Sequence, residues 1–147
     1  MINWVLKKFE DLTVYELYAV LQLRNEVFVV QQNCVFQDAD NKDKQCWHYM
    51  GWENDNLVAY ARIIPAGVAY EYASIGRVVN SPGERGRGIG KELMKTAIER
   101  TYELFGKVPI KIGAQLYLKK FYSSFGFVQT GEIYLEDGIE HIHMVLK

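Results

Sequence analysis

The chain has 147 residues, 49% of them hydrophobic, and a net charge of −1, so we expect one domain over residues 1–147 with a proper hydrophobic core. The near-neutral charge gives no electrostatic basis for binding nucleic acid or anionic lipid, and no apolar run approaches the roughly 20 residues of a membrane span. Two cysteines are too few for a disulfide framework, and the first residues lack the basic and apolar segments of a secretory signal, so we expect a cytoplasmic protein with two free thiols.

The N-terminal third predicts a strand, a helix and a loop. Asn3–Lys8 has the aromatic and branched character of a strand. Thr13 and Glu16 stand at the N-cap and N3 positions of a capping box. The apolar spacing after them predicts a helix from about Val14 to about Phe28. The polar stretch 37–45 is expected to be a loop.

Three strands and a long helix are predicted next. Residues 46–52 and 57–64 are two strands joined by a turn, so they should form an antiparallel hairpin. A further strand, 74–79, ends at the Asn-Ser-Pro-Gly cluster of residues 80–83. A helix begins near Gly88, and the stripe that it should bury is Ile89, Leu93, Met94, Ala97 and Ile98.

The C-terminal part predicts a strand over 108–114, a short helix over 116–124 and a final hairpin. The hairpin strands are 127–135 and 139–146, and Asp137-Gly138 is the turn between them. The element order is therefore β-α-β-β-β-α-β-α-β-β, which predicts an α/β fold with a mixed sheet and helices on its faces. The step from the strand before the long helix to the strand after it should be a parallel, right-handed crossover.

Three alternating glycines, Gly86, Gly88 and Gly90, stand where a predicted strand gives way to the long helix. The first amide groups of a helix have no partners within the helix, and the helix dipole favours negative charge beside them. Residues without a Cβ let a phosphate approach the backbone closely. Arg85 and Arg87 would add positive charge, so the turn predicts an anion site of the kind that holds a pyrophosphate. The alternative is a glycine-rich turn without a ligand.

Two other phosphate motifs do not fit this turn. A P-loop needs glycine where Arg85 stands and serine or threonine where Glu92 stands. A dinucleotide fingerprint starting at Gly88 needs glycine or alanine where Leu93 stands, and an acidic residue at the end of the next strand. That strand ends in Ala-Gln, so a nicotinamide or flavin dinucleotide is not indicated.

The turn does fit a third motif. Arg85–Gly90 resembles the R/Q-x-x-G-x-G/A motif of the GNAT acetyltransferase superfamily, and Ala114–Phe127 resembles its "A-N … F-Y-x-x-x-G-F" segment. The stretches 23–32, 76–79 and 136–141 are similar to the ElaA-like subgroup of that superfamily. The resemblance extends over nearly the whole chain. It implies the GNAT acyl-CoA N-acyltransferase fold: a mixed, mostly antiparallel sheet that is splayed at the cofactor site, with helices on both faces.

The resemblance also implies acetyl-CoA as co-substrate and no metal. In GNAT enzymes the strand before the turn pairs through its backbone with the pantetheine arm, and the residues in that place here are Val78 and Val79. Gln115 stands where many relatives have asparagine and is expected to contact the pantetheine. The pyrophosphate would be held by Arg85, Gly86, Arg87, Gly88, Gly90 and Lys91.

The reaction that the resemblance implies is direct transfer of an acetyl group to a primary amine of a small molecule or a peptide. Tyr122 resembles the general acid of the superfamily, which protonates the departing thiolate. The alternative is that Tyr122 only packs under Phe127.

The base that deprotonates the amine is left open, because the strand before the turn carries no carboxylate. A water chain is one alternative, and the candidate side chains are Glu26, His48, Glu71, Asp137 and His141. A second set is a candidate for binding an acidic group of the substrate: Arg24, Arg62, Arg77 and His141. For the three arginines, ion pairs within the protein are the alternative.

Two groups of residues superficially resemble metal ligands. His141 and His143 are two apart on a predicted strand and point the same way, but no third ligand is suggested nearby. Asp38, Asp40 and Asp43 lack the glycine and the closing glutamate of an EF-hand. We expect no metal, and we expect the aspartates to lie in a solvated loop, with the rim of the active site as the alternative.

Two other functions compete with acetyl transfer to an amine. A non-catalytic module that binds or senses acyl-CoA would keep the glycine-rich turn without needing Tyr122. An acyl-homoserine-lactone synthase-like acyltransferase is a second enzyme hypothesis, since the region from Arg24 to Asp43 resembles the early part of those enzymes. The sequence is also compatible with a homodimer.

Overall fold

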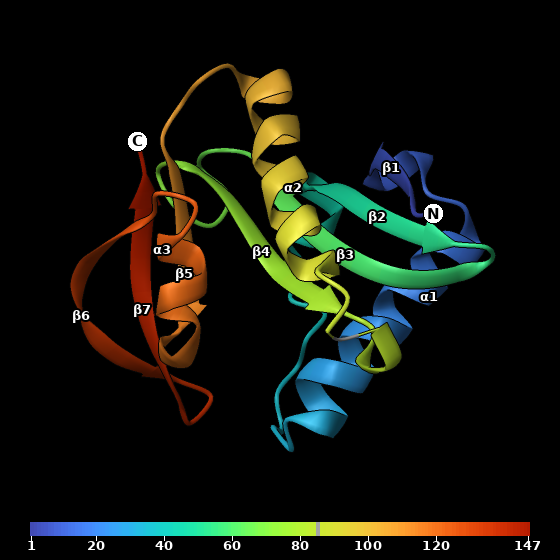
Figure 1. Ribbon diagram of the computed structural model, residues 1–147, viewed down its shortest axis with the longest axis horizontal. Coiled ribbons are helices and arrows are strands. Elements are labelled where there is room, and N and C mark those ends of the chain that lie inside the picture. The colour runs from blue at the N-terminus through green and yellow to red at the C-terminus, as the bar shows by residue number, and fades with distance from the viewer. Residues whose placement is uncertain (85) are drawn as a thin grey trace.

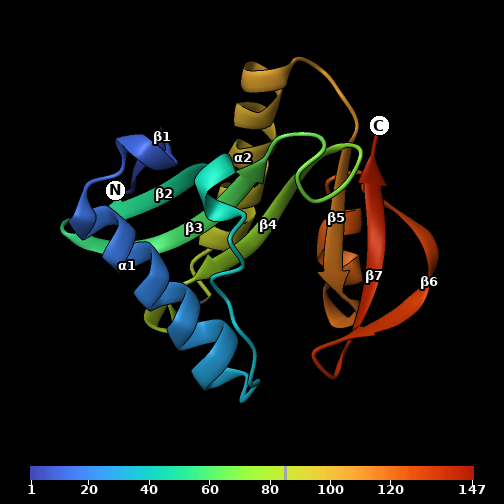
Figure 2. The same cartoon turned by 180° about the vertical axis from the view of Figure 1, so that it is seen from behind.

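The computed structural model describes residues 1–84 and 86–147, and its centre is one seven-stranded sheet (Figures 1 and 2). The strand order is β1-β2-β3-β4-β5-β7-β6. All neighbouring strands are antiparallel except β4 and β5, which are parallel. The strands are β1 (Asn3–Lys8), β2 (Trp47–Glu53), β3 (Asn56–Ile64), β4 (Ala73–Asn80), β5 (Ile110–Gln115), β6 (Val128–Glu136) and β7 (Ile139–Leu146).

Helices cover both faces of this sheet. α2 (Ile89–Phe105) and the short α3 (Lys119–Ser123) lie on one face, and α1 (Val14–Arg24) lies on the other (Figures 1 and 2). A 3₁₀ turn, Leu116–Leu118, precedes α3. The expected fold class, the element order and the parallel step across α2 are confirmed. No helix in the described ranges is long and apolar enough to cross a membrane.

The start of α1 has the predicted capping box. The Thr13 hydroxyl accepts from the Glu16 amide at 3.0 Å, and the Thr13 amide donates to the Glu16 carboxylate at 2.8 Å. Thr13 therefore pairs one of the amides that a helix start leaves without partners. The α-helix ends at Arg24 and continues as a wider π-helical segment, Asn25–Gln31. The helical path thus ends slightly later than predicted and changes its winding.

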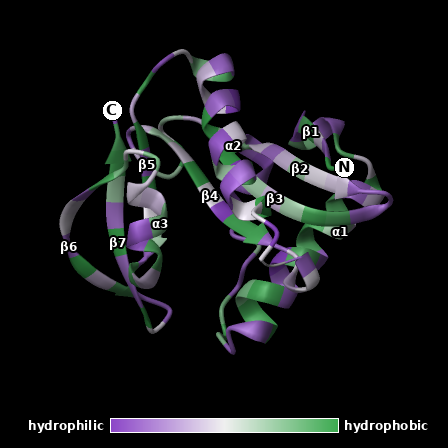
Figure 3. Cartoon of the chain, in the orientation of Figure 1, coloured by the Kyte–Doolittle hydropathy of each residue, from purple (hydrophilic) through white to green (hydrophobic). Residues whose placement is uncertain are grey.

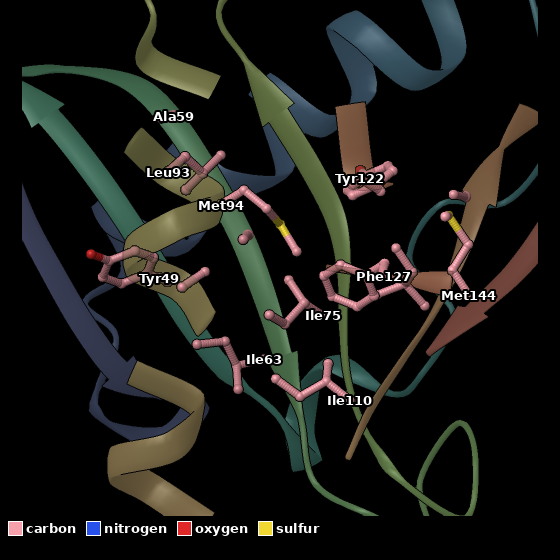
Figure 4. Close-up of a cluster of buried hydrophobic side chains, with 14 of the residues drawn as sticks. Tyr49, Ala59, Ile63, Ile75, Leu93, Met94, Ile110, Tyr122, Phe127 and Met144 are labelled. Atoms are coloured by element: carbon pink, nitrogen blue, oxygen red, sulfur yellow. The ribbon is translucent and has the colours of Figure 1, made fainter. Parts of the chain in front are cut away.

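Two hydrophobic cores lie on opposite faces of the sheet, because successive strand residues point to opposite sides. On the α2 face, Leu93 and Met94 pack with Tyr49 and Ile63 (Figure 4). On the α1 face, Val20, Leu23 and Val27 pack with Met50 and Tyr60. Along its length α2 alternates between hydrophilic and hydrophobic residues, as a helix with one buried side must (Figure 3).

Between β4 and β5 the sheet opens, and this opening positions the site. The two strands pair only at Ala73–Ile110 and Ser74–Lys111. Farther along, β4 has a bulge, because two residues between Gly76 and Val79 face one residue of β3. Arg77, in this bulge, has a φ of +51°, a conformation that is uncommon for residues other than glycine. The splay expected from the sequence is therefore present.

Candidate active site

A cleft of about 870 Å³ opens where β4 and β5 separate. Residues 76–80 line it on β4 and residues 112–115 line it on β5. The glycine-rich turn and the start of α2 form one part of its wall, and the π-helical segment and the β6–β7 turn form another. Its volume is within the usual range for small-molecule and cofactor sites.

The glycine-rich turn has the backbone conformation that its sequence suggests. Gly86 and Gly88 have φ values of +87° and +75°, and Gly88 is the N-cap of α2. Gly90 lies close to a neighbouring side chain: a Cβ there would lie 3.0 Å from the Asn80 side-chain nitrogen, so that side chain would have to shift. All three glycines line the cleft, as does Lys91. The positive end of the α2 dipole therefore faces the cleft with a lysine beside it.

Of the two arginines of the turn, Arg87 does not add the expected charge to the cleft. Arg85 lies outside the described residues. The Arg87 guanidinium pairs with Glu53, at 2.9 and 3.0 Å, and with Glu84. These carboxylates hold its pKa above the ordinary value. The guanidinium thus has its charge balanced by protein carboxylates, and Arg87 is not among the described residues that line the cleft.

Tyr122 reaches the cleft from the α2 side of the sheet. It lies in α3, its side chain is 7% exposed, and it belongs to the core beneath α2. Its ring packs edge-on against Phe121 and Phe127, with centroids 5.1 and 6.1 Å away. Burial raises the pKa of its phenol to about 12, so the group stays protonated at neutral pH. Packing under Phe127 and proton donation are therefore compatible roles.

His141 reaches the cleft from the opposite face of the sheet. It is the β7 partner of Gln115 on β5, so these two side chains share a face. The neighbouring pair, Ala114 and Ile142, lies in the core beneath α2. The His141 side chain is nearly buried, and its Nδ1 lies 2.8 Å from the Ile139 carbonyl oxygen.

Two contacts tie the segment after α1 to the far side of the cleft. Gln115 Nε2 donates to Gln32 Oε1 at 3.3 Å, and Cys34 Sγ donates to the Asp137 carbonyl at 3.4 Å. Gln115 lines the cleft, and its amide already has a protein partner, so its contact with the pantetheine stays a prediction. Cys34 and Cys46 are both buried free thiols.

The face that carries His141 is rich in tyrosine and histidine. Tyr134 on β6 stacks on His143 with centroids 4.5 Å apart, and Tyr70 meets the edge of the same imidazole at 5.4 Å. A Cβ on Gly113 would lie 2.8 Å from the Tyr70 hydroxyl and 2.9 Å from the Tyr134 hydroxyl. A side chain at position 113 would therefore displace both hydroxyls.

The three candidate arginines for an acidic substrate group are instead paired with the three aspartates of the loop. Arg24 donates to Asp38 and Asp43, both at 2.8 Å, and its side chain is 0% exposed. Arg62 pairs with Asp40 and Asp43, and Arg77 pairs with Asp38 and Asp40. The guanidinium groups hold the pKa values of Asp40 and Asp43 below the ordinary value against the opposing effect of burial.

This charge network overturns two expectations. The aspartates of the loop are not solvated, since Asp38 and Asp43 are buried and Asp40 is half-buried. The arginines are not a free binding set, because each guanidinium is matched by carboxylates and only Arg77 of the three lines the cleft. The alternative of ion pairs within the protein was the right one. The loop folds inward because buried charges must be paired.

The structure also sorts the candidate bases. His48 is buried, with Nε2 2.9 Å from the Asp43 carbonyl and Nδ1 2.6 Å from the Tyr60 hydroxyl, and burial lowers its pKa. Glu26 lines a separate depression beside α1, and Glu71 is an exposed partner of Lys111. None of these three lines the cleft, whereas Asp137 and His141 do. Glu136, which the sequence did not single out, lines it too.

Within residues 1–84 and 86–147, no three histidine, cysteine, aspartate or glutamate side chains are grouped so that they could hold a metal ion. His141 and His143 share a face, as their spacing predicts, and both lie beside the Tyr134 ring.

Comparison with known proteins identifies the family of this chain. Residues 13–147 match the family model described as the acetyltransferase (GNAT) domain. The chain belongs to the GNAT acetyltransferase family. Protein ElaA of Escherichia coli K12 is 46% identical over 146 residues, which cover 98% of this chain and 95% of ElaA. The resemblance to the ElaA-like subgroup is thus confirmed.

Solved structures agree with this assignment. An acyl-CoA N-acyltransferase from Pseudomonas aeruginosa superposes with a TM-score of 0.96 at 41% identity, and E. coli ElaA with 0.94 at 44%; both alignments cover 100% of each chain. A GNAT acetyltransferase from Elizabethkingia anophelis, solved with acetyl-CoA bound, has a TM-score of 0.66 at 18% identity, with 99% of this chain and 97% of that chain covered. This last likeness shows a shared fold.

Proposed function

We propose that the protein is an N-acetyltransferase that moves the acetyl group of acetyl-CoA directly to a primary amine of a small molecule or a peptide. The observation that carries the proposal is the cleft at the β4–β5 splay, which has a glycine-rich helix start in its wall and Tyr122 and His141 on opposite faces. Membership of the GNAT family and the acetyl-CoA bound to the Elizabethkingia relative support acetyl-CoA as the donor.

The cofactor would lie along β4. The bulge at Arg77 turns the strand away from β5, so the backbone groups of Val78 and Val79 lack a β5 partner and can pair with the pantetheine arm. The pyrophosphate would lie against the amides of residues 86–91, where the α2 dipole and Lys91 favour negative charge. This arrangement would place the thioester in the gap near Tyr122.

In the reaction the amine nitrogen forms a bond to the thioester carbonyl carbon, and the carbon–sulfur bond breaks. The sulfur leaves as a thiolate and takes a proton from the Tyr122 hydroxyl. In water a phenol is a weaker acid than a thiol, so it would not readily protonate a thiolate. Tyr122 is buried, and a thiolate beside it would be poorly solvated. Because the charged thiolate is unstable there, proton transfer from the phenol becomes more favourable.

The charges of the cleft favour a cationic acceptor. Arg77, the arginine among the described lining residues, is already paired with aspartates. Glu136 and Asp137 line the acceptor side, beside His141. A carboxylate next to the amine would therefore meet like charge, and no described residue that lines the cleft offers a free guanidinium to balance it.

The acceptor preference can be tested with matched amines. We expect the kcat/KM of phenethylamine to be at least about tenfold higher than that of phenylalanine. The kcat/KM of agmatine should exceed that of arginine by the same factor. A tenfold ratio corresponds to about 1.4 kcal/mol. Thiol release from acetyl-CoA, with the acetylated product identified by mass spectrometry, gives both rates. Equal or better use of the amino acids would contradict the acceptor assignment.

The cofactor site can be tested with a matched pair of glycines. Gly88 and Gly67 both have positive φ, and a Cβ at either would meet nothing within 4 Å, but only Gly88 lines the cleft. Each Gly→Ala change should cost about 1–2 kcal/mol of backbone strain. We expect Gly88→Ala to weaken CoA binding at least about tenfold, roughly 1.4 kcal/mol, and Gly67→Ala to leave it unchanged.

Isothermal titration of CoA into the two variants measures this difference, and thermal melts confirm that they are equally folded. Unimpaired CoA binding by Gly88→Ala would overturn the pyrophosphate assignment.

The same assays separate the competing functions. An acyl-CoA sensor would bind CoA through the glycine-rich turn and acetylate no amine. An acyl-homoserine-lactone synthase-like enzyme would prefer longer acyl donors, so a series of acyl-CoA chain lengths distinguishes it. We also propose that the protein acts in the cytoplasm on free amines, alone or as a homodimer, and without nucleic acid or a membrane.

A further inference from the structure

We propose that His141 is the general base that takes the proton from the acceptor amine. This inference rests on the proposed acetyl transfer and deepens it, because it names the group on the acceptor side of the reaction. His141 lies opposite Gln115 in the sheet, and a hydrogen bond orients its ring.

The His141 ring is held in one tautomer and one orientation. A carbonyl oxygen can only accept, so the 2.8 Å contact with Ile139 requires Nδ1 to carry the hydrogen. In the neutral ring the free lone pair is then on Nε2. The side chain is 8% exposed and lines the cleft, and Tyr134 stacks on it with centroids 5.7 Å apart. The imidazole thus has little freedom to turn.

The acid and the base lie on opposite faces of the sheet. Tyr122 belongs to the core beneath α2, whereas His141 shares the other face with Gln115. Both line the same gap between β4 and β5. A thioester in that gap would have its sulfur toward the α2 face and would be open to an amine from the face of His141. The amine attacks from one side and the thiolate departs toward the other. The reaction therefore needs a proton acceptor on the side of the amine and a proton donor on the side of the thiolate.

Glu136 is placed to balance the charge that proton transfer creates. Its Oε2 lies 3.7 Å from His141 Nε2, and its side chain is 59% exposed. The other titratable groups around the ring are Tyr134 on β6, His143 on β7 and Asp137 in the turn, with Lys111 and Tyr70 beyond His143. A carboxylate beside Nε2 stabilises the imidazolium. An alkylammonium nitrogen loses two protons on the way to the amide. His141 takes the first and releases it to water, the second passes to water as the amide forms, and Tyr122 regains from water the proton that it gave to the thiolate.

The test compares His141→Asn with His143→Asn. The side-chain amide of the asparagine introduced in place of His141 can still donate to the Ile139 carbonyl, but it has no basic nitrogen. His143 is the next residue on the same face and does not line the cleft, so its replacement is the matched control. Each variant is assayed across pH with an alkylamine and with an arylamine, which is already neutral at neutral pH.

We expect His141→Asn to lower kcat/KM for the alkylamine by about 100-fold at neutral pH, and by less than tenfold for the arylamine. His143→Asn should change neither by more than about threefold. As a second variant, Glu136→Gln should lower kcat/KM for the alkylamine more than for the arylamine, since the imidazolium that proton transfer forms then lacks the carboxylate 3.7 Å from its Nε2.

Equal losses for both amines at every pH would overturn the base assignment and leave His141 a merely structural role. So would an unchanged rate in a folded His141→Asn protein. If the wild-type protein acetylates neither amine while it binds acetyl-CoA, the proposed function itself fails, and the base assignment fails with it. The wild-type control thus separates the two failures.

Discussion

Replacing Tyr122 with phenylalanine is expected to lower kcat by about 100-fold or more. The phenyl ring keeps the contacts with Phe121 and Phe127, so the fold and the KM for acetyl-CoA should change little. The loss arises because the thiolate then departs without a proton donor beside it. Steady-state rates with acetyl-CoA and the best acceptor amine measure the effect.

Tyr117→Phe is the matched control for this variant. Tyr117 also lines the cleft but is 73% exposed, in the turn before α3. Removing the Tyr117 hydroxyl should leave kcat within about threefold of the wild-type value. A Tyr122→Phe protein that turns over as fast as Tyr117→Phe would show that the acid is another group.

Replacing Arg24 with methionine is expected to lower the free energy of unfolding by about 3–5 kcal/mol. Arg24 is completely buried, and its removal leaves Asp38 and Asp43 with one guanidinium fewer in a poorly solvated place. The loss should be fully expressed at pH 7, because the lowered pKa of Asp43 keeps its carboxylate ionised there. As the pH falls through the lowered pKa of Asp43, protonation removes the ion pair and the difference between variant and wild type shrinks.

Arg100→Met serves as the comparison, since Arg100 pairs with Glu99 and Glu103 at the surface of α2. Surface pairs of this kind contribute about 0–1 kcal/mol. Urea unfolding of the three proteins at pH 7 gives the free energies. An Arg24→Met loss no larger than that of Arg100→Met would show that the buried network is not needed for stability.

The fold was predictable from the sequence because local signals and the global pattern agree. The Thr13–Glu16 capping box, the turn between β2 and β3, and the Asp137-Gly138 turn each have a short-range cause. The glycine-rich turn was also predictable, since positive φ at Gly86 and Gly88 is readily adopted only by glycine.

The charge network was not predictable in the same way. Asp38, Asp40 and Asp43 lie in a polar stretch that is typical of a surface loop, and their partners are up to 39 residues away in sequence. Only the folded sheet brings Arg62 on β3 and Arg77 on β4 beside this loop. Arginines inside otherwise apolar strands were a signal that carboxylate partners lie nearby, but the same signal fitted substrate binding equally well.

Glu136 was missed for a related reason. It precedes a hairpin turn, where an exposed glutamate is ordinary, and its place beside His141 depends on the pairing of β6 with β7. Arg87 shows the converse: its position in the motif suggested a phosphate contact, but Glu53 and Glu84 lie close enough to pair with it.

The central claim is that the cleft transfers an acetyl group from acetyl-CoA directly to an amine. The most direct measurement follows free CoA thiol and N-acetylated amine in the same wild-type reaction over time. The account predicts equal amounts of the two products, formed together and only when both substrates are present. Thiol release without acetylated amine, or CoA binding without any acetylated product across the amine panel, would contradict it.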